Sequence, residues 1–268
     1  MATGTNNSVD RALGLLRTLA RARRPVRFAE LQAVSGIPKG TLHSLLASLE
    51  ASDFVRRTTE GYEIGIAAFE VGTAVRAPAS LRGAAAPLLD ELQPLGEACH
   101  LGMLDGGDVL YLDRRDYAQE ALRYTVRIGS RKPAYATALG KAMLACKTDA
   151  EIESLYRAEL TAVTPRTITS LTELLTVIAG IRSSKYATES EESTPGVCCI
   201  GVAGRSGELI YGLSFTVPVV RMQEADLAPR FLTVLSSVLS RLGTSLTMAE
   251  WFEPGVLSLP ATAAAATL

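Results

Sequence analysis

The 268-residue sequence has only four cysteines and two histidines, and none of the cysteines falls in a CxxC pair. Zinc sites need spaced cysteine and histidine ligands, and disulfide scaffolds need a framework of paired cysteines. The sequence therefore predicts no metal, no cofactor and no disulfide scaffold. We expect the cysteines to be reduced thiols in a cytoplasmic protein.

Long apolar runs are also missing. The best of them, such as residues 209–220, reach about a dozen residues, whereas a membrane-spanning helix needs about 20. The first residues, MATGTNNSVDRALG, do not form a signal peptide, because Asp10 and Arg11 interrupt the place of its apolar core. We expect no membrane association.

Neither sign of charge is in excess, because 27 Lys and Arg against 28 Asp and Glu leave a formal charge of −1. With 47% hydrophobic and 21% charged residues, the composition is typical of a globular protein. The balance hides an asymmetry: residues 1–76 carry 10 basic and 7 acidic side chains, and residues 77–268 carry 17 and 21. A basic first part on an acidic remainder is consistent with a local nucleic-acid contact.

The first part has the pattern of a winged helix-turn-helix. Helical spacing of apolar residues predicts helices over 9–19, 28–34 and 38–51, with a tight turn at Ser35-Gly36-Ile37 between the second and the third. Alternating residues on both sides of 58–61 predict a two-stranded hairpin, the wing. Two more helices are expected over 66–75 and 81–92.

The remainder alternates strand patterns with helix patterns. Strands are expected over 98–104, 109–114, 122–128, 187–191, 197–204 and 209–217, and helices over 138–146, 149–156, 171–183 and 223–242. This order predicts an α+β fold with an antiparallel sheet. The expected regions are a winged helix-turn-helix domain over 8–76, a linker helix over 77–95, an α+β domain over 96–245 and a tail over 246–268.

Several segments occur in an order that resembles one protein family. They are, along residues 8–245, LQAVSGIPKGTLHSLLASLE, HLGMLDGGDVLYLDR, VRIGSRKPAYATALGKAMLA, TPRTITSLTELL and ESEESTPGVCCIG. This series resembles the IclR family of bacterial transcriptional regulators. The resemblance implies a winged helix, a linker helix and a GAF-like effector-binding domain, assembled as a homodimer or as a dimer of dimers.

The candidate DNA-binding residues lie around the second helix of the helix-turn-helix, whose first turns enter the major groove in such domains. Basic residues of the wing and of the preceding helix add phosphate contacts. The predicted set is Arg27, Lys39, Gly40, Thr41, His43, Ser44, Arg56 and Arg57. The family commonly has Arg where this sequence has Ser44, so we expect one strong phosphate or guanine contact to be missing.

A second candidate site starts at Thr137, which can cap a helix whose first N–H groups favour an anion. Those groups belong to Ala138, Leu139 and Gly140. The resemblance adds an effector pocket made of Glu189, where the family usually has Asp, with Cys199, Ser214 and Thr216. Such a cleft of amides, hydroxyls and one carboxylate suits a small organic acid or its derivative.

Two alternatives come from other classes of protein. Cys199 with His100 as its base would make a Cys-dependent hydrolase, although a buried structural histidine explains His100 in the apolar strand CHLGML more simply. The chain could instead be a ligand-binding module whose winged helix serves assembly and does not read DNA.

The favoured interpretation is a regulator without enzymatic activity. One winged helix makes only a few base contacts, so we expect two or more copies to bind a palindromic operator in double-stranded DNA. The small-molecule effector would change operator affinity. Repression is the more frequent mode that the resemblance implies.

Overall fold

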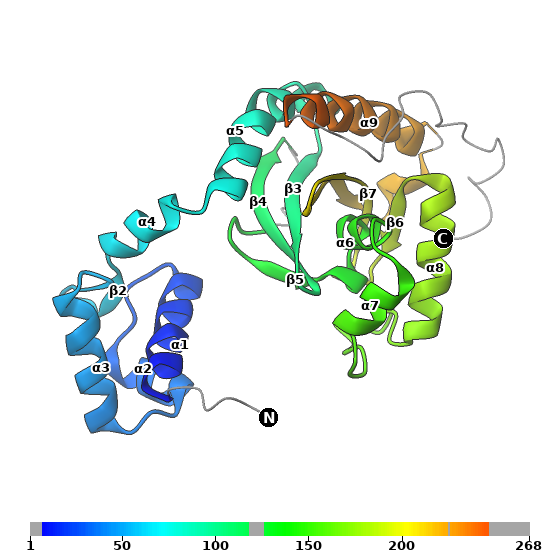
Figure 1. Cartoon of the computed structure of the whole chain (residues 1–268). Coiled ribbons are helices and arrows are strands. Elements are labelled where there is room, and N and C mark those ends of the chain that lie inside the picture. Colours follow the sequence, from blue (N-terminus) through cyan, green and yellow to red (C-terminus); the bar gives the residue numbers. More distant parts are fainter. Residues whose placement is uncertain (1–6, 118–125, 225, 247–268) are drawn as a thin grey trace. The chain divides into compact units, whose positions relative to one another are not determined.

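The computed structural model describes residues 7–117, 126–224 and 226–246 (Figure 1). The chain divides into two compact units, Met1–Arg76 and Ala77–Leu268, and each has a hydrophobic core of its own. In the part of the chain that is described, no helix is both long and apolar enough to cross a membrane. Of the predicted tail over 246–268, all but its first residue lies outside the described residues.

The first unit combines helices with a short hairpin. Its elements are α1 (Asn7–Ala22), α2 (Phe28–Ser35), α3 (Lys39–Ala51), β1 (Val55–Arg57), β2 (Tyr62–Ile64) and α4 (Ile66–Thr73). Apolar side chains of α1, α2, α3 and the hairpin meet in one core, which includes Leu15, Leu31, Leu42 and Val55. Val26 and Tyr62 exchange backbone hydrogen bonds of 2.8 and 2.9 Å, which attach the segment before α2 to the wing.

The turn between α2 and α3 depends on Gly36. This residue has a φ of 64°, in the left-handed region, and its N–H donates to the Gln32 carbonyl at 3.0 Å, which ends α2. Ile37 is buried and Pro38 precedes the first residue of α3, so the chain turns sharply into the next helix. The predicted helix-turn-helix is confirmed.

The second unit is built on an antiparallel sheet with the strand order β5-β4-β3-β8-β7-β6 in its described part. The strands are β3 (Ala98–Asp105), β4 (Asp108–Asp116), β5 (Arg131–Pro133), β6 (Ala187–Ser190), β7 (Val197–Ser206) and β8 (Leu209–Pro218). The central pair joins β3 and β8, the first and the last described strands of the unit. The predicted α+β class and antiparallel sheet are confirmed.

Helices cover both faces of this sheet (Figure 1). Successive side chains of a strand point to opposite faces, so along β7 Cys198 and Ile200 belong to one core and Cys199 and Ala203 to the other. The first core is closed by α5 (Arg76–Asp90) and α9 (Leu227–Ser245). The second core is closed by α6 (Ala138–Leu144), α7 (Asp149–Leu155) and α8 (Leu171–Ser184).

Helix α6 lies close to the sheet because three neighbouring strands carry glycine beneath it. A Cβ added at Gly102, Gly201 or Gly212 would come within 2.7 to 3.1 Å of an atom of Leu139. All seven residues of α6 are buried. The missing side chains therefore create the depression that receives Leu139.

The predicted linker helix over 77–95 coincides largely with α5, whose residues Leu81, Ala85 and Leu89 are buried in the second unit's core. Two other sequence predictions differ from the structure. The expected strand over 122–128 falls partly outside the described residues, and its described part, 126–128, is not a strand. The edge strand is β5 instead, since Gly129, with a φ of 81°, turns the chain where Gly129 and Ser130 hydrogen-bond to Tyr111 of β4. The last helix begins at Leu227 instead of 223.

We expect the variant Gly140→Ala to destabilise the second unit by about 2 kcal/mol, the range typical of overpacking. The added Cβ would lie 2.2 Å from the backbone oxygen of Ala134, which cannot move without shifting the chain. Gly180→Ala in α8 is the matched control, because nothing lies within 4 Å of its added Cβ and alanine favours the helix by up to about 1 kcal/mol. Urea unfolding of the full chain measures both. Equal midpoints for the two variants would contradict the close contact between Gly140 and the Ala134 backbone.

Candidate functional site

The second unit contains a small, partly open cavity, lined by polar and apolar residues of α6, of the sheet and of the loops beside them. Its volume is about 10 Å³, which is room for roughly one water molecule. Nine residues line it: Tyr111, Val126, Thr137, Ala138, Leu139, Ser193, Cys199, Ser214 and Thr216. Five of the seven predicted effector-site residues are among them, and Gly140 and Glu189 are not.

The sheet register brings the polar wall of the cavity together. Cys199 on β7 stands opposite Thr216 on β8, and Ser214 stands opposite both Gly201 and His100. The Thr216 hydroxyl lies 3.3 Å from the Cys199 sulfur and 3.4 Å from His100 Nδ1. These side chains share one face because they alternate along their strands.

Burial keeps both candidate catalytic groups uncharged. It lowers the pKa of His100 to about 3, helped by the positive charges of Arg114 and Lys132. Burial also raises the pKa of the Cys199 thiol well above its usual value, and the negative charge of Glu189 adds to this effect. A nucleophilic cysteine needs the thiolate, so the environment of Cys199 opposes the predicted hydrolase alternative.

The start of α6 forms another wall. Thr137 caps the helix, and its hydroxyl accepts the N–H of Gly140 at 2.9 Å. The Gly140 amide, which the sequence predicted to be open to an anion, is therefore already occupied. Ala138 and Leu139 do line the cavity.

Glu189 is not among the lining residues and holds a turn next to the cavity, opposite Cys199 of β7. Its carboxylate accepts the N–H of Glu192 at 2.8 Å, the N–H of Ser193 at 3.4 Å and the Ser193 hydroxyl at 3.2 Å. The side chain is buried, and burial raises the pKa of Glu189 despite these hydrogen bonds. Glu189 therefore holds the lining residue Ser193 in place, and its role as a ligand contact stays a prediction.

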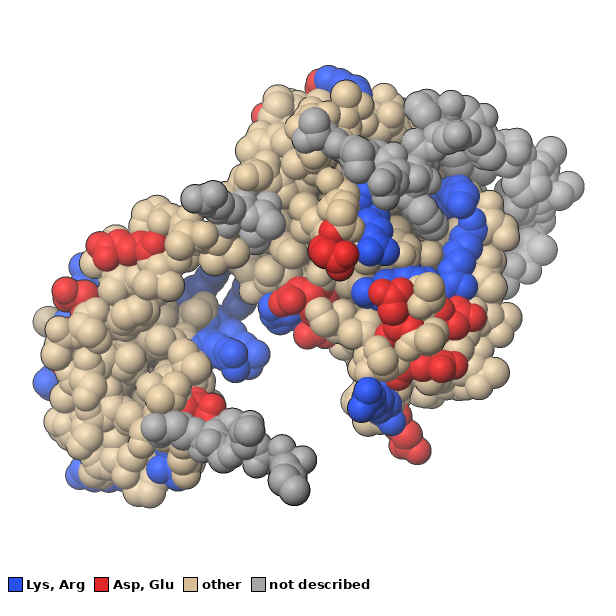
Figure 2. Space-filling view, viewed as in Figure 1, with Lys and Arg blue, Asp and Glu red and all other residues tan. Residues whose placement is uncertain are grey.

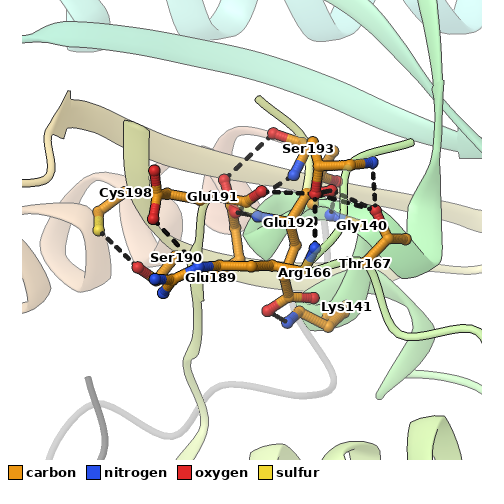
Figure 3. Close-up of polar contacts among 12 residues, drawn as sticks. Gly140, Lys141, Arg166, Thr167, Glu189, Ser190, Glu191, Glu192, Ser193 and Cys198 are labelled. Carbon is orange, nitrogen blue, oxygen red and sulfur yellow. Dashed lines mark hydrogen bonds and ion pairs between the residues drawn. The ribbon is translucent and has the colours of Figure 1, made fainter. Parts of the chain in front are cut away.

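The segment 189–193, here called the acidic turn, is fastened from several sides (Figure 3). Lys141 of α6, which is only 2% exposed, donates to Glu192 at 2.6 Å. The Thr164 hydroxyl donates to the Glu191 carbonyl at 2.7 Å, and the Thr167 hydroxyl donates to the Glu192 carbonyl at 2.7 Å. Arg166 pairs with Glu191 at 3.2 Å. The cavity wall is thus tied to α6 and to the loop that precedes α8.

Four lining residues were not predicted as ligand contacts: Tyr111, Val126, Thr137 and Ser193. Thr137 carried a signal as a helix cap, and Ser193 lies inside the motif that pointed to Glu189 and Cys199. Tyr111 and Val126 carried none. The pairing of β4 with β3 places Tyr111, and Arg114 of β4 donates to the Val126 carbonyl.

The predicted DNA-binding residues lie on three elements of the first unit. Lys39, Gly40, Thr41, His43 and Ser44 occupy the first turns of α3, and all are exposed except the half-buried Thr41. The inward face of that helix is formed by Leu42 and Leu46, which are buried. The predicted segregation of α3 into an apolar and a polar face therefore matches its observed burial.

The basic residues outside α3 differ in their surroundings. Arg27 is exposed immediately before α2. Arg56 of the wing is paired with Glu63 on the opposite strand, through a 2.8 Å bond from its Nε. Arg57 is exposed and lies over the ring of Tyr62, 5.8 Å from the centroid. In the view of Figure 2, Lys and Arg side chains lie at several separate places on the first unit.

Metal binding has no structural support in the ranges 7–117, 126–224 and 226–246, where no three His, Cys, Asp or Glu side chains gather as ligands. Cys198 and Cys199 point to opposite faces of the sheet, which keeps the two sulfurs in different cores.

Replacing Lys141 with Met should lower the free energy of unfolding by about 3 kcal/mol, because the variant leaves the Glu192 carboxylate buried without its cation. Glu192 Oε2 already has no partner in the described structure. The double variant Lys141→Met/Glu192→Gln should recover part of the loss. Lys147→Met, at the more exposed pair with Glu151, should cost less than about 1 kcal/mol. Chemical denaturation of the wild type and the three variants gives the free energies of unfolding. Equal losses for Lys141→Met and Lys147→Met would refute the role of the buried pair.

Comparison with known proteins identifies the two units. The model described as "IclR helix-turn-helix domain" matches residues 8–59, and the one described as "Bacterial transcriptional regulator IclR C-terminal" matches residues 74–241. The chain is 33% identical to the HTH-type transcriptional regulator XynR of Escherichia coli (strain K12), over 82% of this chain and 90% of that protein. It is 32% identical to the regulator KdgR of the same organism, over 82% and 86%.

Solved structures agree in fold. An IclR transcriptional regulator from Alicyclobacillus acidocaldarius matches with a TM-score of 0.76 and 23% identity, over 91% of this chain and all of that one. An IclR homolog from Microbacterium hydrocarbonoxydans, complexed with 4-hydroxybenzoate, matches with a TM-score of 0.78 and 22% identity, over 90% and 99%. With both domains matched and relatives above 30% identity along most of their length, this chain belongs to the IclR family of bacterial transcriptional regulators and not to a class of enzymes.

Proposed function

We propose that this regulator is a repressor whose affinity for a palindromic operator changes when a small organic acid, or its derivative, occupies the cavity of the second unit. The observation that carries the proposal is the cavity itself, a buried space lined by the hydroxyls of Ser214 and Thr216, the Cys199 thiol and the start of α6. Because the target is DNA, the protein acts in the cytoplasm.

The size of the cavity supports a change of state on binding. At about 10 Å³ it holds no more than a water molecule, so an organic acid has to bind a state in which the wall has moved. A ligand that binds one of two states more tightly shifts the population toward that state. If that state also binds the operator less tightly, the ligand lowers the affinity for DNA and DNA lowers the affinity for the ligand by the same factor.

The first unit supports DNA reading through the exposed polar turns of α3. Lys39 stands at the start of the helix, and Arg57 extends from the wing. A single unit offers few base contacts, so two copies related by a twofold axis would read two half-sites.

A homodimer, or a dimer of dimers, is part of the same proposal. Ile66, Phe69, Val71 and Val75, in α4 and just after it, are 55 to 69% exposed. Several large apolar side chains in solvent favour an association that covers them. A ligand-binding module that does not read DNA would also associate through these residues, but it would not bind an operator.

Arg57→Ala should weaken operator binding and make the slope of log affinity against log salt about one unit shallower, as expected when one phosphate contact is lost. Arg56→Ala should change the slope less, because Glu63 already neutralises part of its charge. Fluorescence anisotropy with the intergenic DNA beside the protein's own gene gives the slopes. Arg157→Ala, at an exposed arginine of the second unit, is the control. Unchanged slopes for both wing variants would favour the module that does not read DNA.

Thr216→Val should raise the effector concentration needed for operator release about tenfold, since it removes a cavity hydroxyl while nearly keeping the side-chain volume. Operator affinity without effector should stay within about twofold. The assay is an operator-release titration with the acid that a screen of small organic acids identifies. Thr176→Val, on the exposed side of α8, is the control and should leave the titration unchanged. An unaltered titration of Thr216→Val would show that the effector does not bind in this cavity.

A further inference from the structure

Lysine is rare in this chain, and one lysine differs from the rest in its surroundings. The sequence has five lysines, all within the described residues. Lys39 is exposed as the first residue of α3, and among the described residues none makes a hydrogen bond or an ion pair with its ammonium group. The other four are buried or half-buried: Lys132, Lys141, Lys147 and Lys185.

The surroundings of these four lysines protect them from reagents. The Lys141 side chain is 2% exposed and donates to Glu192 at 2.6 Å. Lys147 is 22% exposed and pairs with Glu151 at 3.2 Å. Lys132 donates to the Thr194 hydroxyl at 3.1 Å, and Lys185 is half-buried at the end of α8. A lysine attacks an electrophile as the accessible, deprotonated amine, so burial and hydrogen bonding of the ammonium group both slow the reaction.

In the first unit, arginine supplies nearly all of the positive charge. Residues 1–76 contain nine arginines and a single lysine, Lys39. A guanidinium group stays protonated in proteins, whereas a lysine amine can lose its proton and accept an acyl group. Acylation removes the charge of the lysine. An acylating reagent can therefore change the charge of this unit at the side chain of Lys39 and at no arginine.

His43 is placed to take up the proton that acylation releases. It follows Lys39 by four residues in α3, and side chains at this spacing are neighbours on a helix, with about 5–6 Å between their Cβ atoms. His43 is exposed, and its ring lies against Phe28 of α2 with the ring centroids 5.6 Å apart. Histidine is the side chain that most often accepts a proton in such reactions. The first turn of α3 contains no acidic residue, so no carboxylate of that turn holds the Lys39 ammonium group in its charged form.

We propose that Lys39 is a modification site, acylated at Nζ by acyl phosphates, and that this modification weakens operator binding. The deprotonated amine attacks the acyl carbon, so that a C–N bond forms and the C–O bond to the phosphate breaks. The phosphate leaves with the electron pair of that bond, and His43 passes the amine proton to it. The modification site is independent of the effector cavity, and its effect on DNA rests on the proposed function.

Acetyl phosphate tests the site itself. The full-length protein is incubated with acetyl phosphate, and acetylation of each lysine is followed by peptide mass spectrometry. Lys39 should react about tenfold faster than each other lysine, whose amines must first leave a hydrogen-bond partner or a buried position. In denaturing urea, which removes these differences in surroundings, the five rates should agree within about threefold. His43→Gln should slow the reaction of Lys39 about fivefold and leave the other lysines unchanged.

Three outcomes would overturn this part of the inference. If another lysine reacts as fast as Lys39 in the native protein, Lys39 is not the preferred site. If the preference for Lys39 persists in urea, the folded structure does not cause it. An unchanged rate in His43→Gln would remove His43 from the reaction.

Fluorescence anisotropy with the intergenic DNA beside the protein's own gene tests the consequence. Acetylated wild type should bind about fivefold more weakly than untreated protein, and its slope of log affinity against log salt should be about one unit shallower. Lys39→Arg should have the same affinity before and after treatment with acetyl phosphate, because arginine is not acylated. Lys147→Arg, which removes a lysine of the second unit, should respond to the treatment as wild type does.

The two assays separate this inference from the proposed function. Equal operator binding by acetylated and untreated wild type would defeat the inference and leave the regulator proposal intact. A response to acetyl phosphate that persists in Lys39→Arg would also defeat the inference alone. Selective acetylation of Lys39 in a protein that does not bind the operator specifically would defeat the regulator proposal and keep the modification site.

Discussion

The close approach of α6 to the sheet is the constraint on which the rest of the second unit depends. Gly102, Gly201 and Gly212 lie on three adjacent strands, and together they leave the depression that Leu139 fills. A side chain at any of them would push the helix outward. Because the start of α6 is also a wall of the cavity, the same glycines set the distance between that wall and Thr216.

A buried ion pair extends this constraint to the acidic turn. Lys141 lies on α6 and Glu192 lies on the turn that carries Ser193, so the helix and the turn that face each other across the cavity are linked by charge. A buried pair of this kind contributes little net stability, but it penalises every arrangement in which its members separate. The wall therefore has a defined closed position, from which a ligand-bound state can differ.

The two units perform separate physical tasks. In the first, a small apolar core holds the polar turns of α3 at the surface, where they can meet phosphates and base edges. In the second, groups that could do chemistry are kept neutral by burial: His100 is deprotonated, and Cys199 is a thiol bonded to Thr216. Such a site is suited to recognition by hydrogen bonds and poorly suited to nucleophilic catalysis.

The sequence by itself determined the local structure and the family. Helical and alternating periodicities located nearly all the described helices and strands, Gly36 marked the turn of the helix-turn-helix, and Thr137 marked the start of α6. These features could be predicted because they depend on neighbours a few residues apart. Five of the seven predicted effector-site residues also line the cavity, because motif order preserved their positions.

Only the tertiary structure decided which of these groups meet. Pairing of β3 with β8 and of β7 with β8 set Cys199 against Thr216, and the glycine depression fixed the distance to α6. The hydrogen bonds from Glu189 to the Glu192 amide and the Ser193 hydroxyl fix the turn that carries the lining residue Ser193. Strand register, backbone approach and the choice among competing hydrogen-bond partners depend on residues far apart in the chain, and no local pattern encodes them.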